Sequence, residues 1–201
     1  MMIEQVTYRP HAAIARVLSD VLSPPVLAVP GLILAAWMCH DSRAIGYALC
    51  YLLVAVVAPL LYVVWMFKTG RINDIHLPNR SDRTLPFLIN LLGGAAAVAL
   101  LVQLGAPGDF LAPILALLAQ TLLLFAITLL WQVSIHTATV AGVAMLSVMA
   151  LGEGCALLFL LVPLVAWARI YLGRHTIAQT VVGAAIGVSC FALVPALRML
   201  V

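Results

Sequence analysis

Charged residues are scarce in this sequence. Only 8% of its 201 residues are Asp, Glu, Lys or Arg, whereas 65% are hydrophobic. A soluble globular domain carries about 25% charged residues, so the composition excludes a soluble domain and predicts a multi-pass integral membrane protein. The ten Lys and Arg residues form no basic run and are not interleaved with aromatic residues. This pattern excludes a nucleic-acid partner.

The four cysteines show none of the spacings that bind metals. Cys39, Cys50, Cys155 and Cys190 lie in or beside apolar stretches, with neither a Cys-x-x-Cys pair nor a His partner at metal-ligand spacing. We interpret them as small core residues and expect no metal and no cofactor. A cleavable signal peptide is not expected either, because Glu4 interrupts the N-terminal region and the next apolar stretch is long enough to span a membrane.

Long uncharged apolar runs set the fold class. A chain of 201 residues has room for six or seven spans of about 20 residues each. The runs cover residues 21–39, 44–67, 84–107, 110–131, 137–152, 154–168 and 176–197. The fifth and sixth runs are short and are separated only by Glu153 with its flanking glycines. We predict an all-α, polytopic transmembrane helix bundle that forms a single domain over residues 1–201.

The segment before the first span has the periodicity of an amphipathic helix. Apolar residues recur at i, i+3, i+4, i+7 and i+8, with polar residues between them: Ile14, Val17, Leu18, Val21 and Leu22 alternate with Arg16, Ser19 and Asp20. This pattern is typical of a helix that lies in the membrane interface. We therefore expect an N-terminal interfacial helix within residues 1–22.

Three polar segments interrupt the apolar runs, at residues 68–83, 132–136 and 169–175. With seven spans, these first, second and third polar segments are the second, fourth and sixth loops, which all lie on one face of the membrane. They can therefore converge on one site. A merged fifth and sixth span would move the third polar segment to the opposite face.

The basic residues are divided unevenly between the two faces. Only Arg43 and Arg198 fall on the face opposite the polar segments, and the other eight are Arg9, Arg16, Lys68, Arg71, Arg80, Arg83, Arg169 and Arg174. The positive-inside rule then predicts that the polar segments face the cytoplasm. Basic residues recruited to bind phosphate would raise this count on either face, and removal of the polar segments leaves two against two.

The third polar segment begins with Arg169 and ends with His175, and Gln179 follows it just before the Gly-punctuated apolar run 180–188. Charged groups are costly in a bilayer, so an Arg and a His between two spans indicate a ligand, and phosphate fits both side chains. The segment resembles the third signature motif of the type 2 phosphatidic acid phosphatase superfamily. In that motif Arg, five residues, His, three residues and then Asp precede a Gly-containing helix. The Asp position is Gln179 here.

The other two polar segments resemble the remaining motifs of that superfamily. Ser134-Ile135-His136 corresponds to Ser-Gly-His, with Ile in place of the Gly, and we expect backbone strain there if the position needs the freedom of glycine. The first polar segment matches the pattern Lys, six residues, Arg-Pro only loosely, with its Lys lost or displaced. Arg83 is the favoured counterpart, and Arg80 is the second choice. The resemblance covers about residues 60 to 190, as a phosphatase-like core.

The resemblance implies a metal-independent phosphoric monoester hydrolase that acts on a lipid or isoprenoid phosphate. His175 would be the nucleophile that forms a phosphohistidine, and His136 would be the acid and then the base. Arg169, Ser134, Arg83 and Arg80 would bind the phosphate, assisted by backbone N–H groups of a helix that starts near Thr137. These residue types suit the task, because His titrates near neutral pH and the guanidinium group matches phosphate oxygens.

Two other classes of function stay open. Gln179 can hold a histidine tautomer but cannot stabilise an imidazolium ion, and the change from Asp to an amide in an analogous triad costs on the order of 10⁴ in rate. The first alternative is therefore a catalytically degenerate family member that serves as a lipid-binding structural subunit, with partner subunits in a larger membrane complex. The second alternative is intramembrane prenyl transfer, based on Asn73-Asp74 and Asp82, which is disfavoured because such enzymes hold magnesium with two Asp-rich loops.

Some of these residues also fit purely structural roles. Ser134 would cap a helix, with His136 as an interfacial residue beside it. The Gly183 and Gly187 pair, like Gly93-Gly94, is typical of close helix packing in membranes.

Overall fold

The computed structural model describes residues 11–71 and 80–201, except for the side chains of residues 80–83. The described residues are all-α. The helical elements are α1 (Ala12–Val21), α2 (Pro24–Cys39), α3 (Ala44–Tyr51), the π-helical η1 (Leu52–Val57), α4 (Ala58–Lys68), α5 (Arg80–Gln103), α6 (Gly108–Leu130), α7 (Ile135–Leu151), the 3-10 helix η2 (Glu153–Leu160), α8 (Leu161–Tyr171), α9 (Ile177–Ala192) and α10 (Val194–Arg198).

Six of the helical stretches within the described residues are long and apolar enough to cross a membrane, and α7 is a shorter apolar helix. The protein is therefore a multi-pass integral membrane protein. The break between the fifth and sixth predicted runs is confirmed, since α7 ends at Leu151 and Gly152 adopts a φ of 99° before η2 begins. A φ of this sign favours glycine, because a Cβ would clash with the backbone. The chain reverses there, so α7 and α8 are separate elements of a hairpin.

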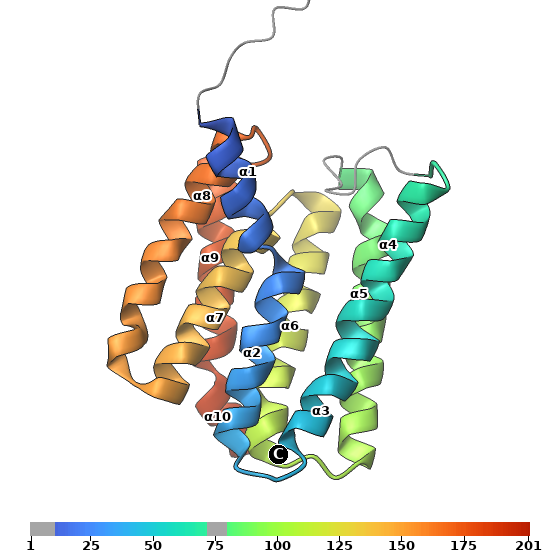
Figure 1. The fold of residues 1–201 in the computed structure, drawn as a ribbon, viewed down its shortest axis with the longest axis vertical. Coiled ribbons are helices and arrows are strands. Elements are labelled where there is room, and N and C mark those ends of the chain that lie inside the picture. Colours follow the sequence, from blue (N-terminus) through green and yellow to red (C-terminus); the bar gives the residue numbers. More distant parts are fainter. Residues whose placement is uncertain (1–10, 72–79) are drawn as a thin grey trace, which may run out of the picture.

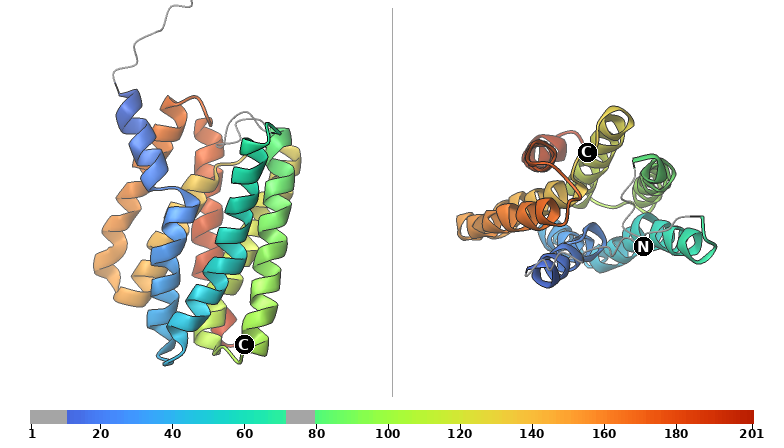
Figure 2. Two further views of the ribbon diagram at one scale, coloured as in Figure 1. Left: turned by 45° about the vertical axis from the view of Figure 1, so that its right-hand side comes forward. Right: turned by 90° about the horizontal axis from the view of Figure 1, so that it is seen from above.

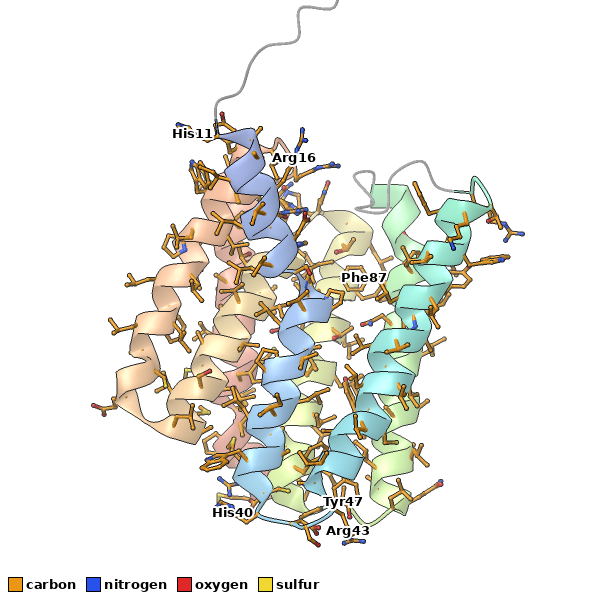
Figure 3. All side chains as sticks on the ribbon, in the orientation of Figure 1. His11, Arg16, His40, Arg43, Tyr47 and Phe87 are labelled. Atoms are coloured by element: carbon orange, nitrogen blue, oxygen red, sulfur yellow. The ribbon has the colours of Figure 1, made fainter. Side chains whose placement is uncertain are left out.

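The bundle has one end where the polar segments gather, which we call the polar end. Helices α4, α6 and α8 end there and α5, α7 and α9 begin there, at the top of Figure 1. Viewed from above, α8 lies on one side of the bundle, α4 and α5 lie on the other, and α2 and α6 lie between them (Figure 2). Arg16 lies at the polar end, whereas His40 and Arg43 lie at the opposite end (Figure 3). The predicted convergence of the second and third polar segments on one end is confirmed.

The predicted amphipathic helix is present as α1, which packs against α8. Its buried residues are Ala15 and Ser19, whereas Ile14, Val17 and Val21 are all more than half exposed. These three apolar residues point outward, as suits a surface that contacts lipid. Arg16 and Asp20 are exposed as well, and the residues that face the bundle are Ala15 and Ser19. The location of α1 in the membrane interface stays a prediction.

Close contact between α7 and α9 joins the second and third polar segments. A Cβ atom on Gly183 would overlap the carbonyl oxygen of Ser134, and one on Gly187 would overlap that of Ala138. The predicted packing role of this glycine pair is confirmed. In a lipid environment, small residues let two helix backbones approach closely enough for van der Waals packing to hold them.

The end opposite the polar segments is held by two acid–arginine contacts. Arg198 Nε donates to Asp109 Oδ1 at 2.6 Å, which ties α10 to the start of α6. In the loop before α3, the backbone N–H of Arg43 donates to Asp41 Oδ1 at 2.6 Å. This hydrogen bond, with the Arg43 side chain, lowers the pKa of the Asp41 carboxyl.

Candidate anion site at the polar end

A cavity of about 470 Å³ lies between the helices and reaches the polar end. His136 from the second polar segment and Arg169 and His175 from the third all line it. The remaining walls are mostly apolar and come from α2, from α3 through α4, and from α5, α6 and α7. We call this space the central cavity. It combines a basic mouth with an apolar interior, as an amphiphile with an anionic head would require.

The turn between α8 and α9 places His175 beside Arg169. Helix α8 closes with Gly173 at a φ of 67°, while Gly173 N–H donates to Ile170 O and Arg174 N–H donates to Arg169 O, each at 2.9 Å. This is the Schellman arrangement, in which a residue in the left-handed region ends a helix. The glycine in the third motif therefore has a backbone role, and the reversed chain brings His175 back to the cavity wall.

Arg169 is buried, with 3% of its surface exposed, and its Nη1 donates to Ser19 Oγ at 2.8 Å. Ser19 is buried to the same extent and comes from α1, 150 residues earlier in the chain. The adjacent Asp20 also lines the central cavity. The amphipathic pattern identifies Ser19 only as a polar residue of a helix and does not predict its contact with Arg169. Its i+4 spacing from Ala15 on a small-residue stripe was the one available signal.

The ring of His175 has a defined orientation because Gln179 Oε1 lies 3.1 Å from its Nδ1. The backbone N–H of Thr176 donates to the same oxygen at 3.0 Å, which identifies that atom as the amide oxygen. An amide oxygen only accepts hydrogen bonds, so Nδ1 must carry a proton. In the neutral ring, Nε2 is then the nitrogen that carries the lone pair.

Gln179 also completes a capping box at the start of α9. Its backbone N–H donates to Thr176 Oγ1 at 3.3 Å, while its side chain accepts from the Thr176 backbone. The Thr-x-x-Gln spacing is a recognisable signature of a helix start. The glutamine is therefore explained by helix capping as well as by its contact with His175, and the sequence contained the signal for both.

In the second polar segment, His136 lines the central cavity, whereas Ser134 does not. Ser134 is fully buried, caps α7 by accepting from Thr137 N–H at 3.5 Å, and is not among the residues that line the central cavity. Its own N–H donates to Gln179 O at 3.1 Å, which links the second and third polar segments directly. Helix α7 begins at Ile135, two positions before the expected start, and Ile135 takes an ordinary helical conformation without the strain expected from replacing a glycine.

The first polar segment is described only in part. Lys68 is exposed at the end of α4 and α5 begins at Arg80, but the side chains of Arg80, Asp82 and Arg83 lie outside the described residues. Asn73 and Asp74 also lie outside them. The predicted roles of these residues stay predictions.

Comparison with family models, curated proteins and solved structures finds no match to this chain. The resemblance to the phosphatase superfamily therefore depends on the three short motifs. The geometry adds a chemical observation: a histidine oriented through its Nδ1, a second histidine and a buried guanidinium group line the same cavity. Such a set can bind an anion and transfer protons near neutral pH.

Proposed function

We propose that this protein binds a lipid or isoprenoid phosphate in the central cavity and hydrolyses its phosphate ester through a phosphohistidine on His175. The observation that carries the proposal is the His175 ring, which is held through Nδ1 by Gln179 and lines the same cavity as the buried Arg169. The apolar walls below offer room for the lipid chain. Nε2 is the nucleophile, because Nδ1 is occupied as a donor.

The reaction has two steps. First, His175 Nε2 attacks phosphorus, the bond from phosphorus to the lipid oxygen breaks, and protonated His136 gives its proton to that oxygen. Second, a water molecule attacks the phosphohistidine, His136 accepts a proton from that water, and the phosphorus–nitrogen bond breaks to release inorganic phosphate. Arg169 balances negative charge on the phosphoryl oxygens throughout.

A lipid-binding structural subunit is the second candidate. It is favoured by two observations: the neutral Gln179 stands where a carboxylate would stabilise an imidazolium ion, and Ser134 is buried as a helix cap. Under this proposal the central cavity holds a lipid without turnover. Partner subunits would then cover part of the outer surface.

The deciding experiment measures phosphate release from several lipid and isoprenoid phosphates by the purified full-length protein, with and without EDTA. We expect release that survives EDTA, is lost in His175→Ala, and is strongly slowed in His136→Ala. His40→Ala is the matched control, because His40 lies at the opposite end of the bundle. No release from any substrate, with lipid still bound, would favour the structural subunit. A magnesium requirement would favour prenyl transfer.

A further inference from the structure

Gln120 places an uncompensated polar group in the middle of the bundle. It lies on α6, is 2% exposed and lines the central cavity, and its Oε1 accepts no hydrogen bond from the described residues. Such a group costs free energy when it is buried without a partner, and in a membrane there is little water to replace one. Polar residues inside spans are accordingly markers of ligand pathways.

The neighbouring helices leave space for the Gln120 amide. A Cβ atom on Gly142 of α7 would lie 3.0 Å from Gln120 Oε1 and 2.7 Å from the Phe191 ring. The absence of a side chain at Gly142 therefore makes room for both the amide and the aromatic ring. Gly142 follows His136 by six residues on α7, so Gln120 lies about 9 Å below the mouth of the cavity along that helix.

Other polar side chains also line the central cavity. Tyr51 is one of them, and another is Asn90, whose Nδ2 donates to Ala55 O in the π-helical segment η1 at 3.1 Å. The lining residues on α2 run from Pro24 to Ala35, which is about 17 Å of helix against a hydrocarbon core of roughly 30 Å. The cavity is thus deep, apolar for most of its length, and polar at Gln120.

We infer that Gln120 binds a hydroxyl group carried within the apolar chain of the ligand, about 9 Å from the head group at the mouth. A hydroxyl fits because it donates to Oε1, which lacks a donor among the described residues, and can accept from the NH2 group of the same amide. The ligand class is then a hydroxylated amphiphile with an anionic phosphate head. The inference depends on the proposed function only for the identity of that head group.

The test uses alkyl phosphonates, whose phosphorus–carbon bond is not hydrolysed, so that binding is measured without turnover. A series of equal chain length carries a hydroxyl at successive positions, and the unsubstituted chain serves as reference. We expect one position near 9 Å from phosphorus to bind the wild-type protein about three- to tenfold more tightly than the unsubstituted chain, the effect of one neutral hydrogen bond. Gln120→Leu should remove this preference and bind the unsubstituted chain at least as well.

Thr128→Val is the matched control, since Thr128 is also a buried α6 residue whose hydroxyl has no hydrogen-bond partner among the described residues, yet it does not line the cavity. It should keep the positional preference. If Gln120→Leu does not fold, Gln120→Met replaces it, because methionine is apolar and adapts to its surroundings. Equal binding of all isomers to the wild type would overturn the inference, as expected if a water molecule alone satisfies Gln120. If the protein releases no phosphate but still prefers one hydroxyl position, the proposed hydrolase activity is overturned and the hydroxyl site at Gln120 stands.

Discussion

At the scale of single residues, Gln179 has both a structural role and a role in the proposed site. Its amide oxygen receives the Thr176 backbone N–H and orients the His175 ring, so one atom both caps α9 and sets a tautomer. A carboxylate in this position would do both and would also stabilise the imidazolium ion that forms during catalysis. The two proposed functions, hydrolase and structural subunit, therefore predict different outcomes when a charge is introduced at residue 179.

We predict that Gln179→Glu increases phosphate release by at least about tenfold, a gain of roughly 1.4 kcal/mol in the activation barrier. Glutamate has the length and shape of glutamine, so both hydrogen bonds persist while a charge partner for His175 is added. The measurement is phosphate release together with the melting temperature. Gln179→Asp is the companion variant, which supplies the charge on a shorter side chain. A lowered melting temperature without faster release in both variants would support the structural subunit.

Ser19 is a positioning residue for Arg169, and its loss should weaken phosphate handling. Ser19→Ala removes the hydroxyl that accepts from Nη1 of the buried Arg169, and hydrogen bonds to charged groups contribute about 1.5–3 kcal/mol. We expect kcat/KM for phosphate release to fall about tenfold, with KM raised. Ser19→Thr, which keeps the hydroxyl, should restore most of it. Ser147→Ala is the control: Ser147 is equally buried but donates only within α7, to Val143 O. Equal losses in Ser19→Ala and Ser147→Ala would show that the effect is general destabilisation.

At the scale of elements, the α7–α9 contact connects helix packing to the site. The same close approach that requires Gly183 brings Ser134 N–H to Gln179 O and Thr137 Oγ1 to Thr180 O at 2.9 Å. Any residue larger than glycine must therefore separate the two helix ends that position His136 and His175. Small residues in one helix thus determine the geometry of polar residues in two loops.

We predict that Gly183→Ala destabilises the protein and reduces phosphate release beyond what the loss of folded protein explains. Overpacking of this kind costs about 1–3 kcal/mol, and here the displaced atoms belong to the site. Gly46→Ala is the control, because a Cβ on Gly46 meets nothing within 4 Å and alanine is favoured over glycine in a helix by about 1 kcal/mol. Thermal unfolding and release per folded molecule are measured in parallel. Unchanged phosphate release by folded Gly183→Ala would show that the α7–α9 packing does not determine the geometry of the site.

Sequence patterns identified the elements better than the contacts between them. Apolar runs predicted the helices, because a bilayer demands such runs for each span. The amphipathic pattern of α1 was also correct, yet periodicity alone does not say whether an apolar stripe faces lipid or protein, and here Ile14 and Val17 face outward. The contact of Ser19 with Arg169 joins residues far apart in the chain, so it required the packed bundle. The capping box at Thr176 and Gln179 was local and was readable from the sequence.

At the scale of the whole molecule, the number of crossings determines which polar residues can meet. In the described part of the chain, six long apolar helical stretches and the shorter α7 bring the second and third polar segments to one end, where His136, Arg169 and His175 line one cavity. Only Glu153 with its two flanking glycines separates the fifth and sixth apolar runs. The positive φ of Gly152 explains how so short a break reverses the chain. A single turn thus decides whether the site can exist.

The positive-inside rule predicts that the polar end faces the cytoplasm, and single introduced cysteines test this. Ser42 lies in the loop at the opposite end and Thr69 follows α4 at the polar end, and both are exposed. In intact cells, a membrane-impermeant thiol reagent should label Ser42→Cys but not Thr69→Cys, while the parent protein with its four cysteines gives the background. Permeabilised cells should label both variants. The reverse pattern would place the polar end outside and show that its arginines serve phosphate binding and not topology. Labelling of both variants in intact cells would contradict the single crossing between residues 42 and 69, and with it the crossing count on which the site depends.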